Sequence, residues 1–250
     1  MSEQNHHAAP GEDAVGPREL EPSDTVRLSG LRATIARRLT RSAAAPMVTL
    51  TTEVDVTAAV ALQRQLVDEW RPHRIRPQFQ DLALAATAHA LAEHPYINAH
   101  LVDDEVRRYS SVNLGFAVSV PDGLLALVIH EAQEKSALEI AGEVRGLMNR
   151  LKAGDLHVQD MKDATFTVTN LGAVGVDAFN PILDPPQIGI LGAGRVVRKP
   201  AEHDGEIALR SMCWLSLTFD HRAIDGYPAG EFLRAVGRGL ENPEWMRSGD

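Results

Sequence analysis

The chain has 250 residues, of which 44% are hydrophobic, and a formal net charge of −9 at pH 7. This length allows one large domain or two small ones, and the apolar fraction suffices for a full hydrophobic core, which excludes disorder of the whole chain. No basic stripe with interleaved aromatic residues is present, so a nucleic-acid-binding surface is not expected. Cys213 is the single cysteine, which excludes an internal disulfide and a cysteine-based zinc site.

The first 26 residues form a distinct segment. They hold six acidic residues and one basic residue, a net charge of −5, with three prolines, two glycines and few large apolar side chains. Such a segment buries too little surface to offset its ordering entropy, so we predict a disordered acidic arm over residues 1–26 and one folded domain over residues 27–250. No run approaches the roughly 18 apolar residues that a membrane helix needs, and a signal-peptide pattern is missing, so we expect no membrane association and a cytoplasmic location.

A helix is predicted to open the folded domain. Ser29 can cap it, and Leu31, Ile35 and Leu39 follow at intervals of four residues, which places them on one apolar face. In chain order, the patterns then predict a strand over 48–54, a helix over 55–70, a helix over 79–93 and short strands around 97–109.

Strands dominate the second half of the domain. Residues 112–120 and 124–129 flank Pro121-Asp122-Gly123, which predicts a turn between two antiparallel strands. The patterns next predict an amphipathic helix over 136–152, strands over 165–169, 188–195 and 213–219, and a last helix over 227–240. Because helices and strands alternate irregularly and an antiparallel turn is present, we predict an α/β domain with a mixed β-sheet flanked by helices.

His221 begins an H-x-x-x-D-G pattern with Asp225 and Gly226, between a predicted strand and the last helix. A histidine at a strand end can project into a cleft, and a neutral imidazole is suited to proton abstraction near pH 7. A structural alternative is a histidine that is hydrogen-bonded to Asp225 within a tight turn. The pattern by itself leaves both interpretations open.

A second candidate segment runs from Thr165 to Gly175. It predicts a strand that ends at Thr169, followed by a loop that contains Gly172 and Gly175. A hydroxyl group in this position could donate a hydrogen bond to a developing oxyanion. In isolation, the simpler interpretation is a β-branched strand residue followed by a turn.

Taken together, these segments resemble the catalytic domain of the dihydrolipoyl acyltransferases of 2-oxo acid dehydrogenase complexes. The resemblance extends from about Leu28 to the C-terminus. It is carried, in family order, by residues 31–39, 112–124 and 166–175, the Pro185-Pro186 pair, and residues 220–226. It implies a chloramphenicol acetyltransferase-like α/β fold with the active site at a trimer interface.

The resemblance also implies roles for individual residues. His221 would be the general base, and Thr169 would occupy the position of the family's catalytic serine, where threonine keeps the hydroxyl donor and adds a methyl group. Asp225 would organise the turn, paired with an arginine for which Arg32, Arg37 and Arg222 are candidates, and Gly226 would permit close backbone approach. The implied co-substrate is acetyl-CoA or another acyl-CoA, without a metal. The implied assembly is a homotrimer, or a larger assembly of trimers, in which the histidine of one protomer faces the hydroxyl of its neighbour.

The sequence departs from this family in two respects. It contains no lipoyl-lysine segment, so we expect no covalent lipoyl group on this chain. The family also has a proline near Leu127 and a basic residue near His130, which calls the substrate contacts on that side into question.

Three functions remain open from the sequence. The favoured hypothesis is a free-standing CoA-dependent O-acetyltransferase of specialised metabolism, such as tetronate biosynthesis, acting on a small-molecule acceptor. The second is an acyltransferase core subunit of a 2-oxo acid dehydrogenase complex that uses lipoyl domains in trans. The third is an inactive scaffold, against which the intact His221, Asp225 and Gly226 argue. The sequence fixes neither the acceptor nor the acyl chain length.

Overall fold

The computed structural model describes residues 21–121 and 123–247. Most of the predicted acidic arm (residues 1–20), one residue of the predicted turn (Asp122) and residues 248–250 lie outside the described residues. Residues 21–29 contain no helix or strand, and α1 begins at Gly30, within three residues of the predicted start of the domain.

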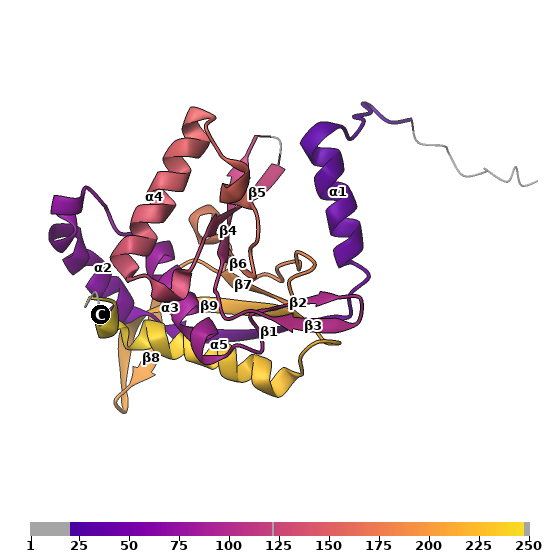
Figure 1. Ribbon diagram of the computed structural model, residues 1–250. Coiled ribbons are helices and arrows are strands. Elements are labelled where there is room, and N and C mark those ends of the chain that lie inside the picture. The colour runs from indigo at the N-terminus through magenta and orange to yellow at the C-terminus, as the bar shows by residue number, and fades with distance from the viewer. Residues whose placement is uncertain (1–20, 122, 248–250) are drawn as a thin grey trace, which may run out of the picture.

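Within the described residues, seven strands form one mixed sheet (Figure 1). Its order is β1 (Met47–Asp55), β9 (Glu206–Asp220), β7 (Gly189–Ala193), β6 (Phe166–Asn170), β4 (Leu114–Val120) and β5 (Gly123–Ile129), and β8 (Val197–His203) also pairs with β9. Strand β6 is parallel to both of its neighbours, and the other pairs are antiparallel. Strands β2 (Ala99–Val102) and β3 (Glu105–Arg108) form a separate two-stranded sheet. The predicted mixed sheet is confirmed.

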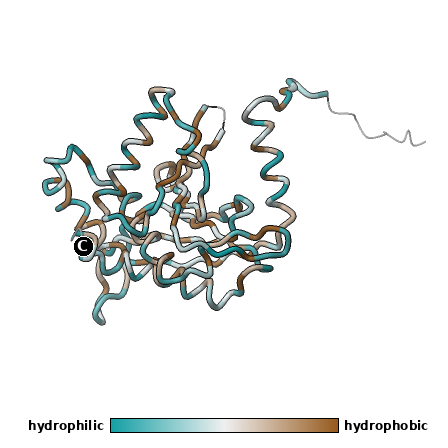
Figure 2. Tube along the Cα trace, viewed as in Figure 1, coloured by the Kyte–Doolittle hydropathy of each residue, from teal (hydrophilic) through white to brown (hydrophobic). Residues whose placement is uncertain are grey.

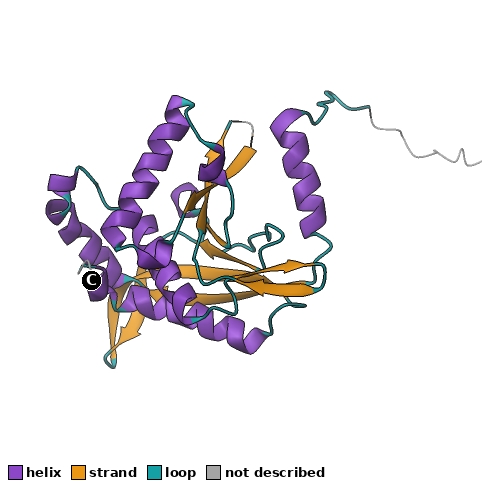
Figure 3. Cartoon of the chain, in the orientation of Figure 1, coloured by secondary structure: helices purple, strands orange, loops and turns teal. Residues whose placement is uncertain are grey.

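Four helices pack around the main sheet (Figure 3). They are α2 (Thr57–Glu69), α3 (Phe79–Glu93), α4 (Ala137–Ala153) and α5 (Gly226–Glu241), and α3 contacts the other three while α5 contacts β1 and β9. Short 3₁₀ helices complete the chain at η1 (Arg71–His73), η2 (Ala132–Glu134), η3 (Val158–Met161), η4 (Gly172–Val174) and η5 (Pro243–Met246).

The hydrophobic core lies between the sheet and this helical layer. Phe166 of β6 is fully buried against Phe232 of α5, with ring centroids 5.4 Å apart, and Val168 is buried on the same face of the strand. Figure 2 shows hydrophobic residues concentrated along the central strands. Because side chains alternate along a strand, Thr167 and Thr169 face the opposite side of the sheet, away from α5.

Helix α1 (Gly30–Ser42) stands apart from the other helices and contacts β5 (Figure 1). Ser29 occupies its N-cap position, as predicted, but its side chain makes no capping hydrogen bond. The position of α1 matters for the site, because it covers part of the sheet face that carries Thr169.

One hairpin was not predicted. Strand β9 begins at Glu206, several residues before the predicted strand, and pairs with β8. Ile207 and Leu209 are exposed there, and Pro200 lies within β8, so neither strand shows the apolar alternation that identifies a half-buried strand. Over the described ranges, no helix combines the length and the apolarity needed to cross a bilayer.

Candidate active site

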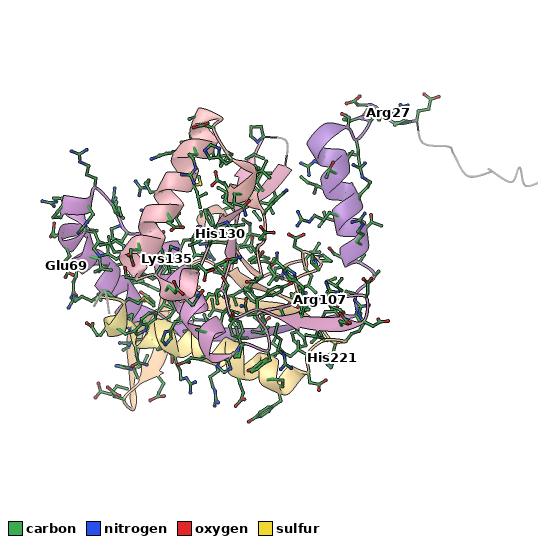
Figure 4. All side chains as sticks on the ribbon, in the orientation of Figure 1. Arg27, Glu69, Arg107, His130, Lys135 and His221 are labelled. Carbon is green, nitrogen blue, oxygen red and sulfur yellow. The ribbon has the colours of Figure 1, made fainter. Side chains whose placement is uncertain are left out.

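His221 directly follows β9, at the strand end that the sequence predicted. Its backbone N–H donates a hydrogen bond to the carbonyl oxygen of Pro46, 3.0 Å away, which ties the residue to the chain just before β1. The imidazole is 42% exposed, and its centroid lies 5.6 Å from that of the Phe219 ring. Figure 4 labels it at the periphery of the molecule. The backbone of His221 is therefore fixed by a hydrogen bond, while its imidazole ring remains partly accessible to solvent.

Asp225 lies next to His221 but does not hold it by a hydrogen bond. His221 Nδ1 and Asp225 Oδ1 are 3.7 Å apart, beyond hydrogen-bonding distance, and the Asp225 side chain is 86% exposed. Asp225 occupies the N-cap position of α5 without a side-chain capping bond. The tightly bonded His–Asp turn of the structural alternative is not what the structure contains.

The arginine of this turn pairs with a different aspartate from the one expected. Arg222 Nε and Nη2 donate to the two carboxylate oxygens of Asp220 at 3.0 and 2.6 Å, and the Arg222 N–H adds a third hydrogen bond at 3.0 Å. Burial raises the pKa of Asp220, but these hydrogen bonds outweigh it and hold the pKa below its ordinary value. Among the described ion pairs, none joins Asp225 to Arg32, Arg37 or Arg222. Asp220, which the sequence reasoning missed, organises the turn.

Gly226 does not play the role predicted for it within one chain. A Cβ atom added at this residue would meet nothing within 4 Å, and its φ is not in the left-handed region. The expected close backbone approach is therefore absent within the chain. Gly226 is simply the first residue of α5.

Thr169 lies near the end of β6, as predicted, and is half-buried. Thr167 lies on the same face of the strand, and its hydroxyl donates to Gln187 Oε1 at 2.7 Å. Across the sheet, Thr169 pairs with Gly192, where an added Cβ would come within 2.9 Å of the Phe179 ring. Glycine at 192 therefore lets Phe179 pack beside Thr169.

His221 and Thr169 do not meet within one chain. The sheet register aligns Thr169 with Gly192 and then with Ser216 of β9. His221 lies five residues further along the chain than Ser216, a separation of about 16 Å along the strand direction at ~3.3 Å per residue. The geometry therefore places the two predicted catalytic groups too far apart for a shared proton or oxyanion.

Thr169 opens onto a cavity of about 360 Å³ between α1, strands β4 to β7 and residues 179–184. Its lining is mostly apolar, with Thr167, Thr169 and Asn180 as polar groups and an ion pair between Arg38 and Asp184. Burial raises the pKa of Asp184, and the neighbouring Arg38 guanidinium opposes this rise.

The two positions of the second departure from the family, Leu127 and His130, lie away from this cavity. Leu127 is fully buried and pairs with Phe116, whose side chain belongs to the core. His130 Nε2 lies 3.1 Å from the Gln159 carbonyl oxygen, and neither Leu127 nor His130 lines the cavity. Within this chain, neither side chain forms part of the surroundings of Thr169.

Cys213 is fully buried, which is typical of an unreactive thiol. Its Sγ lies 3.4 Å from the Gly194 carbonyl oxygen, and burial raises its pKa to about 11. The part of the chain that the structure describes holds no cluster of three or more His, Cys, Asp or Glu side chains that could bind a metal.

Comparison with known proteins identifies the family and the fold. The model of the 2-oxoacid dehydrogenases acyltransferase (catalytic domain) family matches residues 21–247. The acetyltransferase component of the Bacillus subtilis pyruvate dehydrogenase complex is 36% identical over 234 residues, which cover 92% of this chain and 53% of that protein. The succinyltransferase component of the Bartonella vinsonii 2-oxoglutarate dehydrogenase complex is 38% identical over 223 residues, 88% of this chain and 54% of that protein. This chain thus spans about half the length of these curated relatives.

Solved structures show the same fold. A probable dihydrolipoamide acetyltransferase of Listeria monocytogenes superposes with a TM-score of 0.83 at 32% identity, covering 88% of this chain and 94% of that one. The dihydrolipoamide acetyltransferase of Azotobacter vinelandii also gives 0.83, at 31% identity over 96% and 99% of the two chains. The description of the latter structure names a serine, a histidine and an asparagine in the catalytic mechanism.

Proposed function

This chain belongs to the family of 2-oxoacid dehydrogenase acyltransferase catalytic domains, and we propose that it transfers an acyl group between CoA and the thiol of a dihydrolipoyl group carried on another domain. The family match over residues 21–247 carries this proposal. The relatives that match over most of this chain are named as dihydrolipoyllysine-residue acyltransferases of dehydrogenase complexes. They favour the core-subunit hypothesis over the free-standing O-acetyltransferase that we favoured from the sequence.

The proposed reaction needs a base and an oxyanion donor. His221 takes the proton from the attacking thiol, and the resulting thiolate attacks the carbonyl carbon of the acyl-CoA thioester. The Thr169 hydroxyl donates a hydrogen bond to the oxyanion of the tetrahedral intermediate. When the intermediate collapses, the C–S bond to CoA breaks and the CoA thiolate recovers the proton from His221. The steps are reversible, so the same groups serve transfer in either direction.

Because His221 and Thr169 are far apart within one chain, we propose that each active site combines the His221 of one protomer with the Thr169 cavity of another. Any closed symmetric assembly can satisfy this requirement for every protomer, and the trimer is the one that the resemblance to the family implies. Another solved structure, with a TM-score of 0.83 and 31% identity to this chain, is described as the cubic core of a pyruvate dehydrogenase multienzyme complex, which gives a precedent for assemblies larger than a trimer.

Acyl transfer to dihydrolipoamide tests the proposal directly. Purified protein is incubated with acyl-CoA labelled in the acyl group, and the acyl product on dihydrolipoamide or on a small primary alcohol is measured by mass spectrometry. We expect transfer to the dithiol. Thr169→Val keeps the side-chain shape but removes the hydroxyl, so it should lower kcat about 100- to 1000-fold, while Thr169→Ser keeps most activity.

His221→Ala should lower kcat by a comparable or larger factor, because it removes the proposed general base. His203→Ala is the matched control, because His203 is an exposed histidine of the β8–β9 hairpin. Wild-type activity in His221→Ala would refute the mechanism. Transfer to the alcohol but not to the dithiol would restore the O-acetyltransferase hypothesis.

A further inference from the structure

The cavity beside Thr169 bears on the choice of acyl group, which the comparisons leave open. An acetyltransferase and a succinyltransferase are 36% and 38% identical to this chain over similar lengths. Identity of this order does not discriminate between a small neutral acyl group and a larger one with a terminal carboxylate. The inference below rests on the proposed acyl transfer at Thr169.

The cavity has a closed floor and an open rim. Its floor residues are buried: Leu183 is 1% exposed, Thr167 3% and Ile190 6%. Leu39, Ile182 and Leu124 at the rim are 44%, 51% and 53% exposed. A blind apolar pocket beside the hydroxyl suits the end of an acyl chain, whereas the long arms of CoA and of a lipoyl group need a passage that is open to solvent.

The size of the cavity exceeds what an acetyl group fills. An acetyl group has three heavy atoms and occupies about 90 Å³ at ~30 Å³ for each water-sized group, against a cavity of about 360 Å³. The space exists because small residues face each other across β4 and β5. Ala117 and Ala126 are cross-strand partners, and both line the cavity.

The charge of the cavity disfavours a carboxylate. Among the described residues that line it, Arg38 is the one cation, and it forms an ion pair with Asp184. Arg37 and Arg41 line a smaller neighbouring hollow beside Thr34 and Pro185, which shares Arg38 with the cavity, and neither Arg37 nor Arg41 lines the cavity itself. A succinyl carboxylate would therefore have to displace Asp184 from Arg38 or lie beside a like charge, both of which cost free energy.

We propose that the cavity beside Thr169 selects uncharged acyl groups larger than acetyl and rejects succinyl, and isobutyryl and isovaleryl groups serve as the probes of this class. The apolar floor contacts the chain end, the Ala117–Ala126 pair provides its width, and the Arg38–Asp184 pair excludes a charged terminus. Each methylene group that such a pocket accommodates is worth about 10-fold or more in kcat/KM.

The test compares acetyl-, isobutyryl-, isovaleryl- and succinyl-CoA as donors to dihydrolipoamide with the full-length protein. We expect isobutyryl- or isovaleryl-CoA to exceed acetyl-CoA at least about 10-fold in kcat/KM, with succinyl-CoA the poorest donor. Ala117→Leu and, separately, Ala126→Leu fill the width of the cavity. Each should reduce branched-acyl transfer far more than acetyl transfer and so reverse the preference.

Ala153→Leu adds the same side chain at an exposed position of α4 and should leave the preference unaltered. If either leucine variant fails to fold, Ala117→Val tests the same space with a smaller addition. A preference for acetyl or succinyl in the parent overturns the inference while the proposed function stands. A leucine variant that raises KM for dihydrolipoamide without changing the donor preference also overturns the inference and leaves the proposed function standing, because the cavity would then hold the acceptor. No transfer from any of the four donors would overturn the proposed function, and this inference with it.

Discussion

Asp220 anchors the turn from which His221 projects. Its carboxylate is 4% exposed and accepts three hydrogen bonds from Arg222, while its carbonyl oxygen accepts bonds from the N–H groups of Ala223 and Ile224. The buried Asp220 carboxylate therefore holds the turn between β9 and α5 through its hydrogen bonds. Because the imidazole of His221 makes no hydrogen bond to Asp225, the backbone of this turn is what positions His221.

Replacing Arg222 tests this role. Arg222→Met removes two charge-assisted hydrogen bonds and leaves the Asp220 carboxylate buried with its backbone donor, so we expect a loss of about 1–3 kcal/mol in the free energy of unfolding. Arg222→Lys should be intermediate, because an ammonium group does not reproduce the bidentate contact. Urea unfolding at fixed protein concentration measures the loss. Arg234→Met, at an exposed arginine of α5, is the control.

The pH dependence of this loss has a definite sign. The pKa of Asp220 is lowered in the folded protein, so its contribution to stability is present above the unfolded pKa of about 3.9 and is lost as the pH falls through the folded value. The stability difference between wild type and Arg222→Met should therefore be full at pH 7 and shrink below about pH 4. A difference that is constant with pH would show that Arg222 stabilises the turn by packing alone.

At this scale the sequence predicted candidate catalytic residues but not the local partners that the structure gives to the residues around them. His221 and Thr169 were identifiable because their spacing and the resemblance singled them out. The Arg222–Asp220 pair was not, because two residues separated by one position meet only when the turn takes its particular shape. The same holds for Arg38 and Asp184, which are brought together by the packing of α1 on a distant loop.

At the scale of elements, periodicity predicted most helices and strands to within a few residues. The exact agreement of α3 (Phe79–Glu93) with the predicted 79–93 follows from its near-continuous apolar sequence between flanking prolines. Strand β8 was not predicted because it has no apolar face. It forms by pairing with β9, and its residues are exposed or only partly buried. Which side of the sheet each element covers also depends on strand order, which periodicity does not specify.

The first turn of α3 contains a buried acid whose titration should affect stability. Asp81 is 4% exposed and accepts a hydrogen bond from the Gln78 N–H at 2.7 Å. Burial raises the pKa of Asp81 to about 6, against the opposing effects of this hydrogen bond and of Arg145. The folded state thus binds the proton more tightly than the unfolded state does, so this group lowers stability as the pH rises from about 4 to about 6.

Asp81→Asn should remove this pH dependence. Asparagine keeps an oxygen that can accept from Gln78 and carries no charge, so the variant should match wild type near pH 4 and exceed its unfolding free energy by up to about 3 kcal/mol at pH 7. Urea unfolding at several pH values between 4 and 7 provides the measurement. Asp68→Asn, at an exposed acid of α2, should show no such trend. A variant less stable than wild type at pH 7 would contradict the assignment.

At the scale of the whole molecule, the proposed active site requires two protomers, because His221 and Thr169 lie far apart within one chain. The sequence could predict this only through resemblance, because no local pattern encodes which residues lie at an interface. The structure adds a physical reason. The register of β6, β7 and β9 sets the positions of Thr169 and of Asp220, the last residue of β9 and the one directly before His221. A separation of about 16 Å along the strand direction exceeds what a rearrangement of the His221 turn can close.

Complementation between two inactive variants tests this directly. His221→Ala and Thr169→Val chains with different tags are co-expressed, and complexes carrying both tags are purified. If each site joins His221 of one protomer to Thr169 of the next, some interfaces pair an intact His221 with an intact Thr169. Random assembly of equal amounts should then restore about one quarter of wild-type activity before tag selection, because each intact group is present with a probability of about one half.

If instead both residues served one site within the same chain, every chain in the mixture would carry a defect, and activity would stay at the level of the separate variants. Mixing the two purified variants without co-expression is the control, since assembled trimers that do not exchange subunits should remain inactive. Recovery that depends on co-assembly would establish the interface as the catalytic unit. It would also explain why the Thr169 hydroxyl opens away from the helical layer, toward the side of the sheet that a neighbouring protomer must cover.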